Sequence, residues 1–252
     1  MKKLLSAASV ALLALAAGVP AQAAGEGKIA DHEFGFEGIF GTIDRAAAQR
    51  GLQVYNEVCA QCHSLKRVAF RSLKDLGYTE EQVEGIAAQY KVTDGPNDQG
   101  EMYERTAEPK DFFPEPFKND KAAAAVYGVA PPDLSLMTQA RPDGANYLYA
   151  LLTGYEEAPE DFDLPQGAYY NTAFPGHAIK MPAPLSDGQV NYQDGTEATV
   201  AQMAHDVTVF LHWAAEPHME ERKRMGIGVV LFLLVFTGVL YATKRKIWRD
   251  LH

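Results

Sequence analysis

The sequence predicts a mainly α-helical exported domain with long loops, followed by one C-terminal transmembrane helix. Three observations support this fold class. The chain of 252 residues begins with a basic and then apolar segment of the kind that directs secretion. Several helical patterns are separated by long loops that are rich in Gly, Pro and Phe. Near the C-terminus, residues 225–243 contain no charged side chain.

The N-terminal segment has the three parts of a secretory signal peptide. Two lysines precede an uncharged apolar run over residues 4–19, and an Ala-Gln-Ala site follows at residues 21–23. This order predicts cleavage after Ala23. A retained membrane anchor is the alternative, but the apolar run is short and ends in small residues. We therefore expect residues 1–23 to be a signal peptide.

Residues 225–243 predict a membrane-spanning helix, because about 20 apolar residues match the thickness of a bilayer core. A buried core helix is the alternative, and the apolar circumference and charged flanks argue against it. Basic residues lie on both sides of the span, so the positive-inside rule alone does not orient it. The signal peptide exports the N-terminal side. We expect residues 24–224 in the periplasm, a span in a bacterial inner membrane, and residues 244–252 in the cytoplasm.

The exported domain is strongly acidic. The formal net charge of the chain is −10, although both predicted chain ends are basic. This acidity argues against nucleic acid as a partner and favours a basic protein. Two clusters concentrate the charge, and each is either a solvated loop or a docking surface whose attraction salt screens. The first comprises Glu156, Glu157, Glu160, Asp161 and Asp163, and the second comprises Asp94, Asp98, Glu101 and Glu104.

The two cysteines of the chain lie in the motif Cys59-Ala60-Gln61-Cys62-His63. This spacing is the signature of covalent c-type haem attachment. Both thiols form thioethers with haem vinyl groups, and the following imidazole binds the iron. The single motif predicts one covalently bound haem c, with Cys59 and Cys62 as attachment points and His63 as a metal ligand.

Three other interpretations of the cysteine pair are weaker. A structural disulfide is common in exported proteins but does not need a neighbouring His. A thioredoxin-like pair opens a helix after a strand, whereas this pair is expected to close a helix over residues 45–63 that Asp44 caps. A zinc site needs two more ligands, and the sequence has no second cysteine pair.

A second axial ligand is expected among the methionines. Met181 lies in the segment 174–184, where prolines prevent a helix and hold the backbone extended. Such a loop can fix a thioether over a haem face, although a loop Met can also fill a gap in the core. His177 and Met137 are weaker candidates. Met203 lies on the apolar face of an expected helix, which is typical of core packing.

Other elements complete the expected domain. A capping-box pattern at Thr79 predicts one helix. Further helices are expected over residues 146–153 and 196–215, and the latter is expected to cross the helix that carries the cysteine motif. Residues 110–120 are expected to form a loop. Residues 24–44, a lead-in rich in Gly and Phe, are expected to pack on the domain surface.

Five segments together resemble the cytochrome c1 family. They lie at residues 50–59, 131–135, 151–155, 174–176 and 213–217 and read RGLQVYNEVC, PPDLS, LLTGY, FPG and WAAEP. The Cys-x-x-Cys-His motif alone is common to c-type cytochromes. Its combination with these segments and one C-terminal span is specific to this family. The resemblance covers nearly the whole mature chain and implies a c-type cytochrome haem domain.

The resemblance also implies site residues. By it, His63 and Met181 are the two axial ligands of the iron. Arg141 and Tyr147 match residues near a haem propionate, where Arg can hold a carboxylate in bidentate fashion. A surface Arg after a turn is the alternative for Arg141. Pro131 and Pro132 resemble residues that pack at the haem edge, and the additional cysteine pair of some bacterial members is absent from this sequence.

A function follows from the resemblance. Family members are subunits of the cytochrome bc1 complex, beside cytochrome b and the Rieske iron–sulfur subunit. The chain is then expected to pass one electron from the Rieske protein to a soluble basic c-type cytochrome, in respiratory or photosynthetic electron transport. Whether the chain alone counts as an enzyme stays open, because quinol oxidation belongs to the whole complex.

Two alternatives to this function remain. One is a haem enzyme or gas sensor with an open distal position, and the other is the haem subunit of a terminal oxidase. A haem with His and Met on its two faces has no open position, so it carries electrons rather than binding O2 or peroxide. The distal ligand therefore discriminates between electron transfer and an open-site enzyme.

Overall fold

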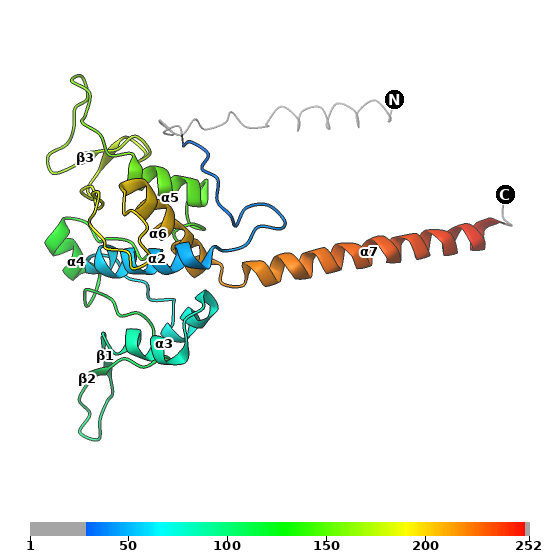
Figure 1. Cartoon of the computed structure of the whole chain (residues 1–252), viewed down its shortest axis with the longest axis horizontal. Helices are drawn as coiled ribbons and strands as arrows, with labels where there is room; N and C mark the ends of the chain where they lie inside the picture. The colour runs from blue at the N-terminus through cyan, green and yellow to red at the C-terminus, as the bar shows by residue number, and fades with distance from the viewer. Residues whose placement is uncertain (1–28, 250–252) are drawn as a thin grey trace, which may run out of the picture.

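The computed structural model describes residues 29–249, which are mostly helical, with two short antiparallel strand pairs (Figure 1). The mainly α fold class is therefore confirmed. The predicted signal peptide at residues 1–23 lies outside the described residues.

Two helices, α2 (Arg45–Glu57) and α6 (Val200–Ala215), pack together at the centre of the domain (Figure 1). Helix α2 begins where predicted, because the side chain of Asp44 accepts hydrogen bonds from two amides of the first turn. Thr199 caps α6 in the same way, so this helix begins four residues later than expected. The apolar faces of both helices meet in the main core.

The two helices approach most closely at Gly51. A Cβ atom built on Gly51 would lie 2.0 Å from the carbonyl oxygen of Asp206 and 2.7 Å from the Cβ of Phe210. Only a residue without a side chain fits at this contact. Met203 is completely buried on the same helix as Asp206, which confirms that it is a core residue.

The cysteine motif lies in a tighter turn than expected. Helix α2 ends at Glu57, and the 3-10 turn η2 (Cys59–Gln61) follows, so the helix predicted over residues 45–63 is too long. The chain leaves the α-helical conformation here because the carbonyl oxygen of Cys59 accepts hydrogen bonds from the amides of both Cys62 and His63, at 3.1 and 2.9 Å. This shared acceptor tightens the chain into a single compact turn.

The predicted capping box is confirmed. Helix α3 (Glu80–Ala87) follows the 3-10 helix η3 (Phe70–Leu76). The hydroxyl of Thr79 accepts a hydrogen bond from the amide of Gln82 at 3.3 Å, and the side chain of Gln82 accepts one from the amide of Thr79 at 2.8 Å. Two amides that the helix itself cannot satisfy are thereby bonded.

Replacing Thr79 with Ala is expected to destabilise the domain by about 1 kcal/mol, the usual cost of losing an N-cap side chain. This loss corresponds to a fall in melting temperature of roughly 2–4 °C for a domain of this size. Circular dichroism of the full chain in detergent measures the change. Thr93→Ala, at an exposed position of strand β1 (Lys91–Asp94), is the control and should leave the melting temperature unchanged.

Strands β1 (Lys91–Asp94) and β2 (Tyr103–Thr106) form an antiparallel hairpin that the sequence analysis did not predict. Arg105 joins its two strands to the following loop. The guanidinium donates to the carboxylates of Asp94 and Asp111, with an Nη2–Oδ1 distance of 2.8 Å to Asp111. These hydrogen bonds lower the pKa of Asp111 to about 2.

The Asp111 ion pair is expected to make stability depend on pH in the acid range. Its pKa is lowered on folding from an ordinary value of 3.8, so its stabilising effect is complete above that value and is lost as the pH falls towards about 2. The melting temperature of Asp111→Asn should therefore lie below that of the native chain at pH 6. The two values should converge as the pH falls through about 2.

The remaining elements surround the two central helices. They are α4 (Asp120–Tyr127), α5 (Gly144–Thr153), β3 (Tyr169–Tyr170) and β4 (Ala178–Ile179). Helix α5 begins two residues earlier than expected and packs on α6. Helix α4 was not predicted; it starts at the end of the expected loop, where the side chain of Asn119 caps it.

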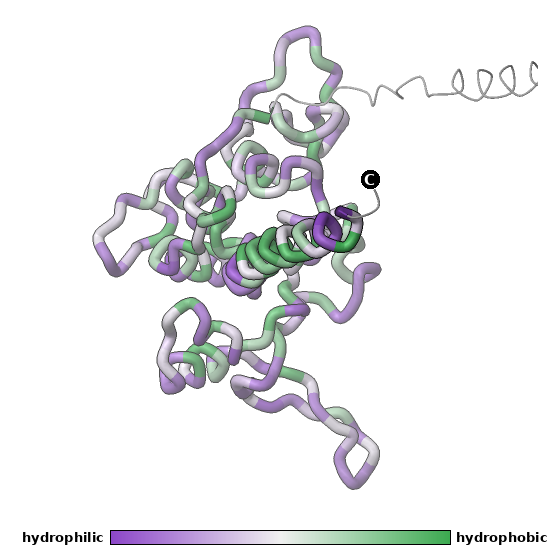
Figure 2. The backbone as a smooth tube through the Cα atoms, turned by 90° about the vertical axis from the view of Figure 1, so that its right-hand side faces the viewer, coloured by the Kyte–Doolittle hydropathy of each residue, from purple (hydrophilic) through white to green (hydrophobic). Residues whose placement is uncertain are grey.

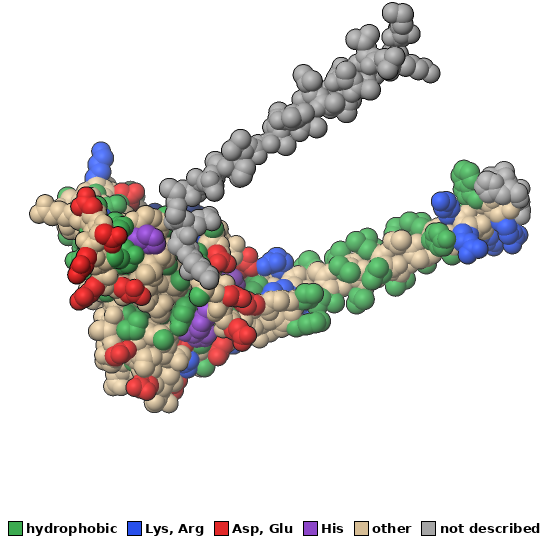
Figure 3. All heavy atoms as spheres, turned by 90° about the horizontal axis from the view of Figure 1, so that it is seen from above, with side chains coloured by type: hydrophobic (Ala, Val, Ile, Leu, Met, Phe, Trp, Pro, Cys, Tyr) green, Lys and Arg blue, Asp and Glu red, His purple; other side chains and the backbone are tan. Residues whose placement is uncertain are grey.

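Helix α7 (Met219–Trp248) projects from the domain (Figure 1). Its central part is apolar, with a mean hydropathy of 2.4, and no part of that stretch is buried by the rest of the described chain. Figure 2 shows the apolar stretch along the helix, and Figure 3 shows basic side chains near both of its ends. The helix is long and apolar enough to cross a membrane.

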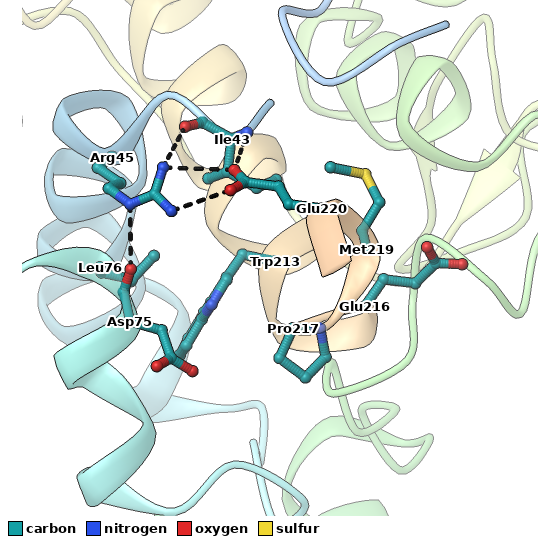
Figure 4. A pocket seen from close by; sticks show the side chains of 9 residues that line it. All are labelled: Ile43, Arg45, Asp75, Leu76, Trp213, Glu216, Pro217, Met219 and Glu220. Atoms are coloured by element: carbon teal, nitrogen blue, oxygen red, sulfur yellow. Dashed lines mark hydrogen bonds and ion pairs between the residues drawn. The ribbon is translucent and has the colours of Figure 1, made fainter. Parts of the chain in front are cut away.

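The junction between α6 and α7 is held by polar contacts. Helix α6 ends before Pro217, which has no amide hydrogen to donate, and α7 begins at Met219. Glu220 then accepts hydrogen bonds from the amide of Ile43 at 2.9 Å and from the guanidinium of Arg45 at 3.1 Å (Figure 4). The start of α7 is therefore fixed to the start of α2.

Candidate functional site

The compact turn at the end of α2 presents His63 in a fixed orientation. Its Nδ1 lies 2.8 Å from the carbonyl oxygen of Pro132. Because a carbonyl oxygen only accepts, Nδ1 carries the proton and donates, which leaves the lone pair of Nε2 available. A histidine that binds a metal is usually oriented by this kind of hydrogen bond.

The surroundings of His63 favour the neutral imidazole. Burial lowers the pKa of His63, while the hydrogen bond to Pro132 and the nearby carboxylate of Asp133 oppose this shift. The effect of burial is the largest of the three, so the pKa of His63 is lowered. A neutral ring with a free Nε2 is the form that binds a metal ion.

The two cysteines of the motif are free thiols, and both are partly buried. Burial raises the pKa of Cys59 to about 12, so its sulfur stays protonated at neutral pH. The thiol of Cys62 donates a hydrogen bond to the hydroxyl of Tyr127 at 3.2 Å. The motif therefore meets the end of helix α4.

The segment that holds His63 is itself fixed by Asp133. The carboxylate of Asp133 accepts hydrogen bonds from the Ser64 hydroxyl at 2.7 Å and from the Lys66 amide at 3.0 Å. It also accepts one from the amide of Ser135 at 3.1 Å. Burial raises the pKa of Asp133, but these hydrogen bonds together outweigh burial and lower it.

Asp133 and Ser64 thus position the Pro132 carbonyl oxygen against His63. Neither residue was among the site residues expected from the sequence. The signal that could have found them is the Pro-Pro-Asp-Leu-Ser segment, in which an Asp follows two prolines without a cationic neighbour. Such an Asp often bonds to nearby backbone amides.

Met181 lies in a second group of residues. It packs with Ile179, Tyr147 and Leu151 in a small apolar cluster apart from the main core. The hydroxyl of Tyr155 donates a hydrogen bond to the carbonyl oxygen of Met181 at 3.1 Å. The loop that carries Met181 is thus attached to the end of helix α5.

Arg141 lies beside Tyr147, which belongs to this second group. Burial raises the pKa of Tyr147, and the nearby guanidinium of Arg141 partly offsets the rise. Arg141 itself is exposed; its Nη1 donates to the neighbouring Ala140 carbonyl oxygen, and its guanidinium also interacts with the Tyr147 hydroxyl. It therefore keeps donors available for an anionic group.

The other candidate ligands make packing contacts. Met137 is buried in the main core. The ring of His177 stacks on Tyr170 at a centroid distance of 5.6 Å, and its Nδ1 donates to the Asn171 carbonyl oxygen at 3.1 Å. The structure thus gives both residues a role in the fold that needs no metal.

The residues of the two groups fit a haem by their chemistry. Two thiols, an oriented neutral imidazole, a thioether and an exposed guanidinium are the groups that attach, ligate and neutralise a haem. The segment before and after Pro132 also exposes apolar side chains that a large apolar group would cover. They are Val126, Tyr127, Val129 and Leu136.

The two acidic clusters differ in the structure. In the hairpin cluster, Asp94 is paired with Arg105, which lowers the pKa of Asp94. All five carboxylates between Glu156 and Asp163 are exposed, and within residues 29–249 none of them forms an ion pair. Figure 3 shows acidic side chains across the domain face seen from above. The cluster from Glu156 to Asp163 therefore keeps all of its negative charge unpaired within the described residues, unlike the hairpin cluster.

Comparison with known proteins identifies the family. The model of the cytochrome C1 family matches residues 34–251. Cytochrome c1 of Rhodospirillum rubrum is 46% identical over 94% of this chain and 94% of its own length. The cytochrome b/c1 of Bradyrhizobium diazoefficiens is 52% identical over 90% of this chain, which spans 36% of that longer protein. A mitochondrial relative from Saccharomyces cerevisiae, named cytochrome c1, heme protein, is 48% identical over 78% of the chain and 64% of its own length. This chain therefore belongs to the cytochrome C1 family.

Proposed function

We propose that this chain is a membrane-anchored cytochrome that carries one covalently bound haem c and transfers single electrons. The observation that carries the proposal is the hydrogen bond between His63 and the Pro132 carbonyl oxygen, beside two free thiols. It leaves one ring nitrogen of His63 available in a fixed direction. Cys59 and Cys62 would form the two thioether bonds.

Each remaining site residue has a defined task in this proposal. The haem supplies a one-electron redox centre. Met181 would provide the second axial ligand, held by the hydrogen bond from Tyr155 to its carbonyl oxygen. Arg141 and Tyr147 would bind a propionate, and Pro132 would pack at the haem edge. With His63 and Met181 both bound to the iron, the site would have no place for O2 or peroxide.

The proposed electron route lies within a bc1 complex. The donor is a Rieske iron–sulfur protein, and the acceptor is a soluble basic c-type cytochrome, in a respiratory or photosynthetic chain. Family membership supports this route, and the name of the Bradyrhizobium relative supports an association with cytochrome b. The exposed cluster between Glu156 and Asp163 is the proposed docking surface, because complementary charge accelerates encounter.

The proposed topology follows the charge and hydropathy of the chain. Residues 1–23 are a cleaved signal peptide, and residues 24–224 form the haem domain in the periplasm. Residues 225–243 of helix α7 span the bacterial inner membrane, and residues 244–252 stay in the cytoplasm. The apolar and fully exposed middle of α7 supports the span.

An absorption spectrum and redox titration of the intact membrane complex test the function. A low-spin ferrous α-band, a weak ferric band from the Met–iron bond and a single one-electron transition are expected. Haem that stays with the polypeptide under denaturing conditions would support thioether attachment. A high-spin ferric spectrum, or rapid CO binding to the reduced protein, would contradict the electron-carrier proposal and favour an open-site haem enzyme.

A further inference from the structure

The loop between Gly35 and Thr42 exposes two large apolar side chains. Phe34 and Phe36 are buried, as expected for a lead-in that packs on the domain. Ile39 and Phe40, at the tip of the loop, are instead 66% and 85% exposed. Contiguous exposed apolar side chains, in contrast to single scattered ones, are typical of interaction surfaces.

The loop has a fixed shape. The amide of Thr42 donates to the carbonyl oxygen of Gly35 at 3.0 Å, which closes the loop at its base. Gly41 turns so tightly that an added Cβ would lie 1.9 Å from the carbonyl oxygen of Glu37. The ring of Phe36 stacks on His212 of helix α6 at a centroid distance of 3.8 Å. The tip is therefore presented by a rigid base.

The loop is attached to the beginning of helix α7. The ammonium group of Lys223 donates to the carbonyl oxygen of Phe36 at 2.5 Å and to that of Gly41 at 3.1 Å. Lys223 lies two residues before the uncharged stretch of α7 begins at Met225. Figure 1 shows the loop extending beside the start of this helix. The tip therefore lies where the helix would enter a bilayer.

We propose that Ile39 and Phe40 insert into the lipid interface and form a second membrane contact beside α7. The two contacts together would set the tilt and height of the domain above the membrane, which one helix cannot do alone. Lipid is the expected occupant because the loop continues the surface of a spanning helix. Apolar side chains gain free energy on burial at this depth.

The proposed contact is apolar rather than electrostatic. The start of α7 carries both signs of charge, with Glu220 and Glu221 beside Arg222 and Arg224. Neutral phosphatidylcholine should therefore be sufficient as the lipid, and added salt should not weaken the contact.

Photocrosslinking of the full chain in phosphatidylcholine vesicles tests the proposal. The photoreactive p-benzoylphenylalanine is introduced in place of Phe40, and lipid adducts are counted by mass spectrometry. The matched control places it instead of Tyr103, an exposed aromatic residue in the hairpin. We expect lipid adducts at position 40 in several-fold excess over position 103, with the same yield at low and high salt.

Two outcomes would overturn the proposal. Equal lipid yields at positions 40 and 103 would show that the tip lies in water. The same variant can also be photocrosslinked in the purified complex. Crosslinks from position 40 to another subunit there, with no lipid adduct in the complex or in the vesicles, would make the tip a protein contact. Neither outcome depends on the haem or its ligands, so the electron-transfer proposal is tested separately.

Discussion

Replacing Met181 with Leu is expected to lower the midpoint potential sharply and to open the iron to CO. A thioether ligand favours reduced iron, and Leu offers no lone pair in its place. Axial ligands alone spread haem potentials over roughly 0.8 V, so the shift should be a sizeable part of that range. A redox titration and a CO difference spectrum measure both effects. Leu fills a similar volume, so the fold is expected to persist.

Two other methionines provide matched controls for this variant. Met203 is fully buried on α6, and Met137 is buried in the main core. Met203→Leu and Met137→Leu change the same atoms in apolar surroundings and should leave the potential and the CO spectrum unchanged. If Met181→Leu kept the native potential while Met137→Leu lost it, the second axial ligand would be Met137.

Local signals predicted much of the fold. Asp44 and Thr79 are N-cap residues in the structure as in the sequence, because an N-cap depends on side chains within one helical turn. The hairpin between β1 and β2 was missed, since its strands are short and mostly polar. The ion pairs of Arg105 with Asp94 and Asp111 stabilise this hairpin. Such pairs cannot be inferred from hydropathy periodicity.

The candidate site was predictable where chemistry is local in sequence. The Cys-x-x-Cys-His motif identified three residues, and the prolines around Met181 indicated a fixed loop. The partner of His63 was not predictable, because Pro132 is 69 residues away and contributes a backbone oxygen rather than a side chain. Asp133 was missed for a similar reason. Its carboxylate bonds backbone amides, and the signal for this in the sequence is an Asp that follows two prolines.

The contact between α2 and α6 contains a buried ion pair. Breaking this pair is expected to destabilise the domain more than any other change proposed here. Two nitrogens of Arg50 donate to the carboxylate of Asp206, at 2.8 and 3.0 Å, and the Asp206 side chain is completely buried. Gln202 adds one hydrogen bond at 3.0 Å. The third Arg50 nitrogen reaches the exposed carboxylate of Asp194 at 2.9 Å. Arg50 therefore has one buried and one exposed partner.

Arg50→Ala is expected to destabilise the domain by about 3 kcal/mol, because it leaves the Asp206 carboxylate buried without its cation. This loss corresponds to a melting temperature lower by roughly 6–12 °C. Asp194→Ala removes only the exposed pair and should cost about 0–1 kcal/mol. Circular dichroism of the full chain in detergent compares the two variants.

The double variant Arg50→Met with Asp206→Leu separates the cost of an unpaired charge from the strength of the ion pair. Replacing both partners with apolar side chains removes the buried charge, so much of the stability lost in Arg50→Ala should return. A double variant as unstable as Arg50→Ala would mean that the pair itself stabilises the helix contact. Arg50 and Gly51 open the first segment that resembles the family, and both act at this contact. That segment therefore holds α2 against α6, and the contact fixes the position of the cysteine turn that follows.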